Sequence, residues 1–237
     1  MSVHHLEFVA VTAQAMGDWR SRRAPLGMSP ALFRGFREQL FDAIALDKLS
    51  DFDVRLKGSA AAIFSGLHKR LPANRAELAD AYKKAYGVPP QPTIQNTMDV
   101  KREQLWALQP YPRRRPFDSM YKLGTDPELS DLDIQISSSD VETQCRTIYS
   151  SHRYGSVPNN SPMIHPTYGF LTSSIVSQVI PEIKFWADQW TLTLGRSVNV
   201  KAFPGSGPPN VTAKFGELSS HYRANDWMIV MPQAGDY

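Results

Sequence analysis

The spacing of apolar residues at every third or fourth position predicts four helices in this chain. Ser29 and Pro30 mark the start of the first helix, because serine caps a helix N-terminus and proline suits the first helical position. Gly87 ends the second helix, and Pro181 must start or kink the last one. The four helical segments are residues 29–44, 72–86, 141–149 and 176–194.

Alternation of apolar and polar residues predicts strands between these helices. The alternation is clearest over 129–136, and the segment 51–57 leads directly into a tight turn at Gly58 and Ser59. Because helices and strands are intermixed, we expect an α/β or α+β fold with one mixed β-sheet flanked by helices. The predicted strands are residues 51–57, 129–136, 197–203, 210–215 and 226–231.

A chain of 237 residues accommodates one large domain or two small ones. We expect one domain over residues 29–237, after an N-terminal arm over 1–28 in which apolar and basic residues follow no clean period. Residues 67–122 differ in character, since a proline-rich break at 88–92 is followed by a charged segment and the arginine run 113–115. We interpret 67–122 as a surface insertion that adds no strand to the centre of the sheet.

The composition is that of an ordinary globular protein, with 42% apolar and 21% charged residues, which excludes a disordered chain or a coiled coil. A net charge of +3 gives only weak support to nucleic-acid binding. The single cysteine, Cys145, cannot form an internal disulfide, and we expect a buried thiol. No apolar run approaches the ~18 residues of a membrane span, and the N-terminus lacks a signal-peptide layout. We therefore expect a cytoplasmic protein without a membrane partner.

Two aspartates in the predicted strand 129–136 are the most informative chemical feature. Asp131 and Asp133 are two residues apart, so on a strand both carboxylates point to the same face. Adjacent carboxylates repel each other unless a cation lies between them. Carboxylate and phosphate oxygens are good ligands for Mg²⁺ or Mn²⁺. An Asp-x-Asp on an exposed strand is usually only solvated, so the interpretation depends on the neighbouring motifs.

Those motifs are Leu56-Lys57-Gly58-Ser59, Gly124-Thr125 and Ser130-Asp131-Leu132-Asp133. In this order they resemble the DNA polymerase β-like nucleotidyltransferase superfamily, with an intervening segment of some 70 residues, longer than the family usually has. The resemblance implies a nucleotidyltransferase-like domain in which Asp131 and Asp133 bind two Mg²⁺ ions on a nucleoside triphosphate. It implies that the remaining motif residues contact the nucleotide: Lys57, Gly58, Ser59, Gly124, Thr125 and Ser130.

The resemblance also implies a third carboxylate on a neighbouring strand, as a metal ligand and proton acceptor. Asn199 occupies a plausible strand, but an asparagine supplies no anionic ligand. Asp226, at the start of the predicted strand 226–231, is our candidate for the third catalytic and metal-binding residue. We expect its strand to neighbour the strand of Asp131 and Asp133.

The implied function is Mg²⁺-dependent transfer of a nucleoside monophosphate from a triphosphate such as ATP to a hydroxyl of a protein, an RNA, a small molecule or a nucleotide. The alternative is a catalytically silent nucleotide-binding or interaction module of the same fold, which the asparagine at Asn199 favours. A non-specific RNA-binding fold is a third, weaker hypothesis. The arginine run 113–115 is either a phosphate contact or, more often, a solvated corner. Trp186 and Trp190 lie one helical turn apart, which is typical of core packing.

Overall fold

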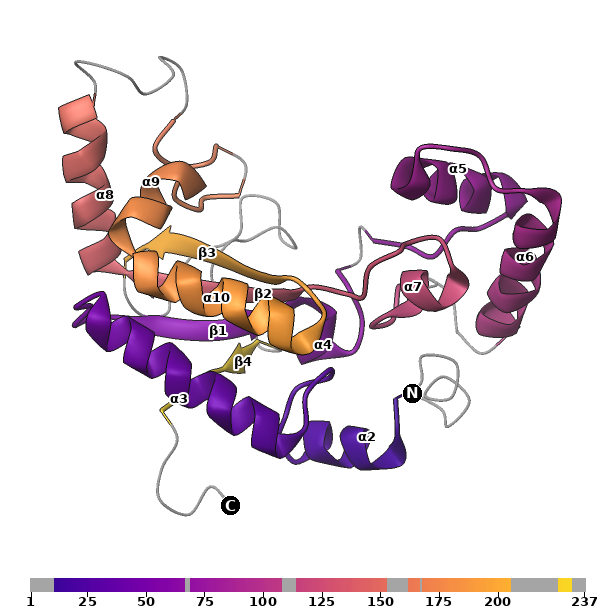
Figure 1. The fold of residues 1–237 in the computed structure, drawn as a ribbon, viewed down its shortest axis with the longest axis horizontal. Coiled ribbons are helices and arrows are strands. Elements are labelled where there is room, and N and C mark those ends of the chain that lie inside the picture. The colour runs from indigo at the N-terminus through magenta and orange to yellow at the C-terminus, as the bar shows by residue number, and fades with distance from the viewer. Residues whose placement is uncertain are drawn as a thin grey trace. The chain divides into compact units, whose positions relative to one another are not determined.

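The computed structural model describes residues 11–66, 69–107, 114–152, 162–166, 168–205 and 226–231. These residues form two compact units. The first, which we call the helical unit, is drawn from 1–30, 58–131 and 195–197, and the second, the sheet unit, from 31–57, 132–194 and 198–237. Figure 1 shows the elements of both units along the chain.

The sheet unit contains a four-stranded mixed β-sheet with the order β3-β2-β1-β4. Strand β1 pairs antiparallel with both β2 and β4, and β2 pairs parallel with β3. Helices flank the sheet, so the predicted fold class is confirmed. The strands are β1 (Asp53–Lys57), β2 (Leu132–Ser138), β3 (Val198–Pro204) and β4 (Trp227–Met228).

Two strand predictions differ clearly from the structure in extent. The prediction at 129–136 is shifted, since β2 covers Leu132–Ser138, and the prediction at 226–231 reduces to the two residues of β4. The predicted strand 210–215 lies outside the described residues. Strands β1 and β2 pair with each other directly, so no strand from 67–122 lies between them.

The helices of the sheet unit begin where local signals place them. Ser138 caps α8, since its Oγ accepts a hydrogen bond from the Val141 N–H at 3.1 Å. Pro181 starts a new helix rather than kinking one, because α9 ends before it and α10 begins with it. These helices are α3 (Pro30–Leu46), α8 (Ser139–His152), α9 (Ser173–Val179) and α10 (Pro181–Leu194).

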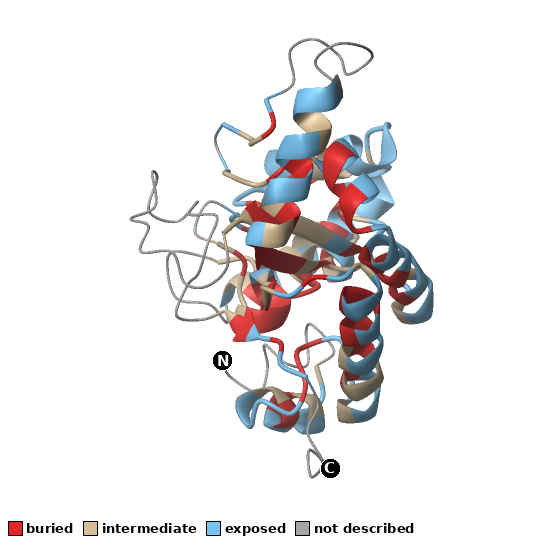
Figure 2. Cartoon of the chain, turned by 90° about the vertical axis from the view of Figure 1, so that its left-hand side faces the viewer, coloured by how far each residue is buried: buried red, intermediate tan, exposed pale blue. Residues whose placement is uncertain are grey.

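The core of the sheet unit lies between one face of the sheet and the helices α3 and α10. Phe36 of α3 packs edge-on against Trp186 and Trp190 of α10, with ring centroids 4.6 and 5.2 Å apart. Phe33 packs against Trp227 of β4 in the same way, which places α3 over the sheet (Figure 1). Both α10 tryptophans are buried, as the helical spacing predicts. In Figure 2 the buried positions run along the strands and along one side of the helices.

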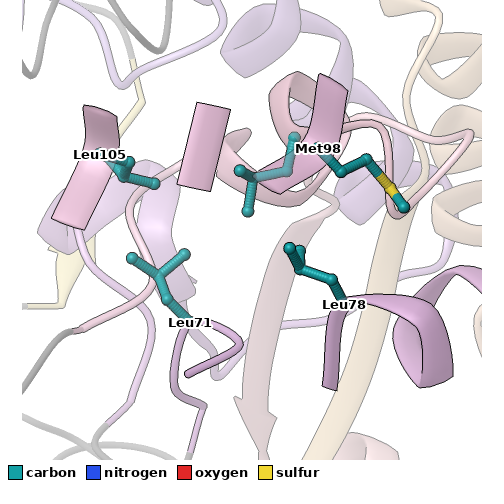
Figure 3. Close-up of a cluster of buried hydrophobic side chains, with 5 residues drawn as sticks. Leu71, Leu78, Met98 and Leu105 are labelled. Carbon is teal, nitrogen blue, oxygen red and sulfur yellow. The ribbon is translucent and has the colours of Figure 1, made fainter. Parts of the chain in front are cut away.

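The helical unit has its own apolar core. Buried leucines and a methionine from α5, α6, α7 and the segment before α5 meet there (Figure 3): Leu71, Leu78, Met98, Leu105 and Leu123. The helices of this unit are α2 (Ala13–Arg20), α4 (Gly58–Ala62), α5 (Arg75–Tyr86), α6 (Pro92–Ala107) and α7 (Ser119–Leu123).

Helices α2 and α6 of this unit were not expected from the sequence. Helix α6 covers most of the segment interpreted as charged and irregular, because its two buried apolar residues, Met98 and Leu105, recur only every seventh position and leave a weak periodic signal. Helix α2 lies in the segment interpreted as an arm without a clean period. Helix α5 does follow its prediction, and Gly87 ends it in the left-handed conformation, with φ at 75°.

Candidate functional site

Four polar residues form a row across the sheet, one from each strand or its end. Asp133 of β2 pairs in register with Lys57 of β1 on one side and with Asn199 of β3 on the other. Asp226 precedes Trp227, which pairs with Leu56, so Asp226 continues the row beside Lys57. Residues directly opposite each other on paired strands share a face. We call Asn199, Asp133, Lys57 and Asp226 the polar row.

The polar row lies on the face of the sheet opposite the apolar core. Its neighbours along the strands, Leu56 and Ile134, are almost fully buried and point to the other face. The members of the row are half-buried or, for Asn199, exposed. Asn199 is therefore the exposed end of the row, while the strands that carry the row are fixed by the core.

Lys57 and Asp226 form an ion pair within the row. The Lys57 Nζ donates to the Asp226 Oδ2 at 3.0 Å, and the two side chains are 19% and 6% exposed. Lys57 therefore shares a face with Asp133, and its ammonium lies on the side of the sheet where the two carboxylates are. The negative charge of Asp226 is compensated by this ammonium.

The expectation that the Asp226 strand neighbours the strand of the aspartate pair is wrong. Strand β4 pairs with β1, so β1 and its Lys57 separate Asp226 from Asp133. The neighbour of Asp133 on the far side is Asn199. The reason is strand order, which alternation along a chain does not encode.

Two predicted nucleotide-binding residues, Gly58 and Ser59, begin helix α4 of the helical unit. Gly58 has φ at 73°, a left-handed conformation that lets the chain leave β1 and enter α4 without a side-chain clash. Ser59 is buried within α4, between Gly58 and the equally buried Ala60. The strand therefore passes directly into a short helix at the position where the sequence predicts a tight turn.

Gly124 and Thr125 end helix α7. Gly124 takes the left-handed conformation with φ at 83°, and its N–H donates to carbonyls of the last helical turn. Thr125 is buried, and its hydroxyl donates to the Met120 carbonyl oxygen at 3.1 Å. In the structure both residues close the helix, and their predicted contact with a nucleotide stays a prediction.

Ser130 is held by two residues that the sequence analysis missed. Its hydroxyl accepts from the Asp118 N–H, and its own N–H donates to the Asp118 Oδ1, both at 2.8 Å. Arg196 donates to both Asp118 carboxylate oxygens and to the Ser130 carbonyl oxygen. Both charged side chains are less than 10% exposed. We call Asp118, Ser130 and Arg196 the clamp, and it fixes the backbone immediately before Asp131.

The residues of the clamp lie far apart in the sequence, at positions 118, 130 and 196, so no spacing pattern reveals them. The one local signal is Asp118 itself, which lies in a turn and has a positive φ of 55°. Such a conformation is tolerated by aspartate better than by most residues and often marks a constrained position.

The interpretation of the arginine run as a solvated corner is wrong for the two arginines that the structure describes. Arg114 stacks over the Phe64 ring at 5.1 Å and donates to the Ser65 carbonyl oxygen. Burial lowers the pKa of Arg115, while the carboxylates of Asp126 and Asp131 act in the opposite direction. Asp131 therefore has a cationic neighbour in its own unit. Arg113 lies outside the described residues.

Cys145 is a buried free thiol, as expected. Burial raises its pKa to about 11, and Glu142 adds to the shift. A thiol with this pKa is a poor nucleophile near neutral pH.

The oxygen donors of the row suit Mg²⁺ only in part. Asp133 and Asn199 supply neighbouring oxygen donors, which suit a hard cation, and Asp226 is occupied by Lys57. Within the described part of the chain, no group of three or more His, Cys, Asp or Glu side chains is arranged to hold a metal. In the sheet unit the residues fit a cation at Asp133 and do not form a three-carboxylate cage.

Comparison with family models, curated proteins and solved structures gives no match for this chain. Among the described helices, none has the length and apolar character needed to cross a membrane.

Proposed function

We propose that this protein is a Mg²⁺-dependent nucleotidyltransferase that moves a nucleoside monophosphate from a nucleoside triphosphate to a hydroxyl acceptor in the cytoplasm. The observation that carries the proposal is the polar row, which sets Asp133, Lys57 and Asn199 side by side on the face of the sheet opposite the apolar core. The Gly58–Ser59 turn follows Lys57 directly in the chain, and Asp131 precedes β2. This is the order of motifs that the resemblance to polymerase β-like enzymes requires.

The residues have distinct proposed roles. Asp133, with Asp131, would hold Mg²⁺ or Mn²⁺, and the amide oxygen of Asn199 would add a neutral ligand. The ion would neutralise the triphosphate. Lys57 would contact a phosphate through its ammonium, and the backbone N–H groups at Gly58 and Ser59 would donate to the same phosphates.

A second candidate function is a silent nucleotide-binding module. Two observations favour it: the position beside Asp133 on β3 holds an asparagine, and the carboxylate of Asp226 is already paired with Lys57. A module of this kind would bind a nucleotide through Lys57 and Asp133 and transfer nothing.

The test is transfer of radiolabel. The protein is incubated with each of the four α-labelled ribonucleoside triphosphates and Mg²⁺ or Mn²⁺, with protein, RNA and nucleotide acceptors, and released pyrophosphate is measured. Asp133→Asn is compared with Asp42→Asn, which removes an exposed carboxylate on α3 of the same unit. We expect transfer by the wild type and by Asp42→Asn, and a loss of at least ~10²-fold in Asp133→Asn.

The alternative outcomes are distinct. A triphosphate that raises the melting temperature of the wild type without label transfer or pyrophosphate release supports the silent module. Equal transfer by Asp133→Asn and Asp42→Asn contradicts the proposed site.

A further inference from the structure

A cavity of about 190 Å³ lies in the sheet unit, along the outer edge of β3. Helix α9, the start of α10 and strand β3 enclose it, and these three elements lie together in Figure 1. Val176 and Ile180 form an apolar wall opposite Val198 and Val200. The volume is below the ~300–1,000 Å³ of pockets for drug-sized ligands, so the cavity suits a flat fragment such as one nucleobase.

The backbone of β3 presents a hydrogen-bonding edge to this cavity. The Val198 N–H donates to the Thr191 Oγ1 at 2.9 Å, and the Ala202 carbonyl oxygen accepts from the Leu171 N–H at 2.8 Å. Both contacts lie on the side of β3 away from β2. Alternate residues of a strand direct their backbone groups to the same edge, so those of Val200, midway between, also point there.

Among the described residues, the N–H and C=O of Val200 make no backbone hydrogen bond to a group outside the sheet. Unpaired backbone groups beside an apolar wall favour a ligand that offers one acceptor and one donor side by side. The hydrogen-bonding edge of a nucleobase has this arrangement, with a ring nitrogen or carbonyl oxygen next to an N–H.

Two lysines line the cavity, and one of them, Lys201, forms no ion pair with a carboxylate of the described residues. Lys201 of β3 donates to the Ser173 Oγ at 3.3 Å and lies over the Phe170 ring, so its ammonium is held at the rim. Lys184 of α10 also lines the cavity and pairs with Asp188 one turn away. Of the residues lining the cavity, none is acidic among those described. A ligand with a phosphate therefore complements the rim.

We propose that this cavity binds a nucleoside 5′-monophosphate, with the base against Val200 and the phosphate at Lys201. The site does not include Asp133, so binding in it can be measured without the metal and separately from the proposed transfer reaction. Asn199 lies at the boundary between the cavity and the polar row, and it lines the cavity while pairing with Asp133. A nucleotide in the cavity would thus lie beside the polar row.

The experiment is calorimetric titration of the full chain, without divalent metal, with AMP, GMP, CMP and UMP. Adenosine, ribose 5-phosphate and inorganic phosphate serve as fragment probes. Ser177→Trp fills the cavity from α9, where Ser177 is exposed and lines it, and Ser174→Trp is the matched control on the same helix outside the lining. Lys201→Met removes the charge at the rim.

We expect at least one monophosphate to bind with 1:1 stoichiometry and a Kd below about 1 mM. Ser177→Trp should weaken this binding at least tenfold, and Ser174→Trp and Asp133→Asn should leave it within twofold. Lys201→Met should weaken binding of the monophosphate tenfold and leave binding of the nucleoside unchanged. The proposal is overturned if no monophosphate binds or if inorganic phosphate binds as tightly as the monophosphates. It is also overturned if Ser177→Trp binds the monophosphate as tightly as Ser174→Trp does. Circular dichroism of each variant shows that it is folded, so loss of binding is not loss of structure.

Discussion

The position of Lys57 in the sheet changes the roles that can be assigned to the residues around it. From the sequence it is one residue of a phosphate-binding motif, whereas in the structure it separates the two carboxylates of the polar row and pairs with one of them. The ammonium of Lys57 compensates the negative charge of Asp226, so this carboxylate does not need a metal ion for charge balance. A bound phosphate would compete with Asp226 for the same ammonium.

Asp226→Asn tests this ion pair. The substitution leaves the ammonium of Lys57, only 19% exposed, without its anionic partner. We expect the free energy of unfolding, measured by urea denaturation, to fall by about 2 kcal/mol, between the values for exposed and fully buried pairs. If Asp226 is the proton acceptor that the resemblance implies, any transfer activity should also fall at least ~10²-fold.

The double variant Lys57→Met/Asp226→Asn is the control for stability. It removes both charges, so part of the lost free energy should return. Full activity in Asp226→Asn, together with loss of activity in Asn199→Ala, would assign the third ligand position to Asn199 instead.

The clamp acts at the same scale, through the backbone that precedes Asp131. Asp118→Ala leaves the guanidinium of Arg196 buried without a carboxylate. We expect a loss of about 3–5 kcal/mol in the free energy of unfolding, the range for breaking a buried pair from one side. Urea denaturation measures it, and a loss below ~1 kcal/mol would show that the pair is of little structural importance.

At the scale of elements, the start of α10 depends on a residue outside the helix. Asp47, just after α3, accepts hydrogen bonds from the N–H groups of Glu182 and Ile183 at 3.1 and 3.0 Å. Burial raises the pKa of Asp47 above its ordinary value of 3.8, and the two N–H groups oppose the shift. The carboxylate therefore caps the helix at a desolvation cost.

Asp47→Asn and Asp47→Ala separate the cap from the charge. The folded protein binds the Asp47 proton more tightly than the unfolded chain does, so the contribution of this group to stability falls as the pH rises through the raised pKa. Asp47→Ala should lose about 1 kcal/mol through the missing cap. Asp47→Asn keeps an acceptor and removes the charge. The free energy of unfolding of Asp47→Asn minus that of the wild type should therefore be more positive at pH 7 than at pH 4. Urea denaturation at both pH values checks this, and a pH-independent difference would contradict it.

At the scale of the whole molecule, Cys145 reports on the unfolding of the sheet unit. The thiol is fully buried, and its pKa of about 11 leaves only about one thousandth of it ionised at pH 8. We expect reaction with a disulfide reagent at pH 8 to be at least ~10²-fold slower in the folded protein than in urea. Comparable rates in both states would show that this region opens readily.

The sequence by itself determines most of the local structure of this protein. Capping and breaking residues act over a few positions, so the starts of α3 and α10 and the end of α5 follow from Pro30, Pro181 and Gly87. Alternation likewise predicts β1 and most of β2, because the two faces of a strand meet different surroundings. The motifs around Asp131 and Asp133 can also be recognised from the sequence alone.

Only the tertiary structure decides which of these elements meet. Strand order places Lys57 rather than Asp226 beside Asp133, and it brings Asn199 to the other side. The clamp joins residues 118, 130 and 196, and the cavity on β3 joins α9 to a strand some twenty residues later in the chain. Helix α6 is stabilised by its packing in the core of the helical unit. The physical reason is common to all four: pairing between distant strands and burial between distant side chains depend on the folded chain, and no local period records them.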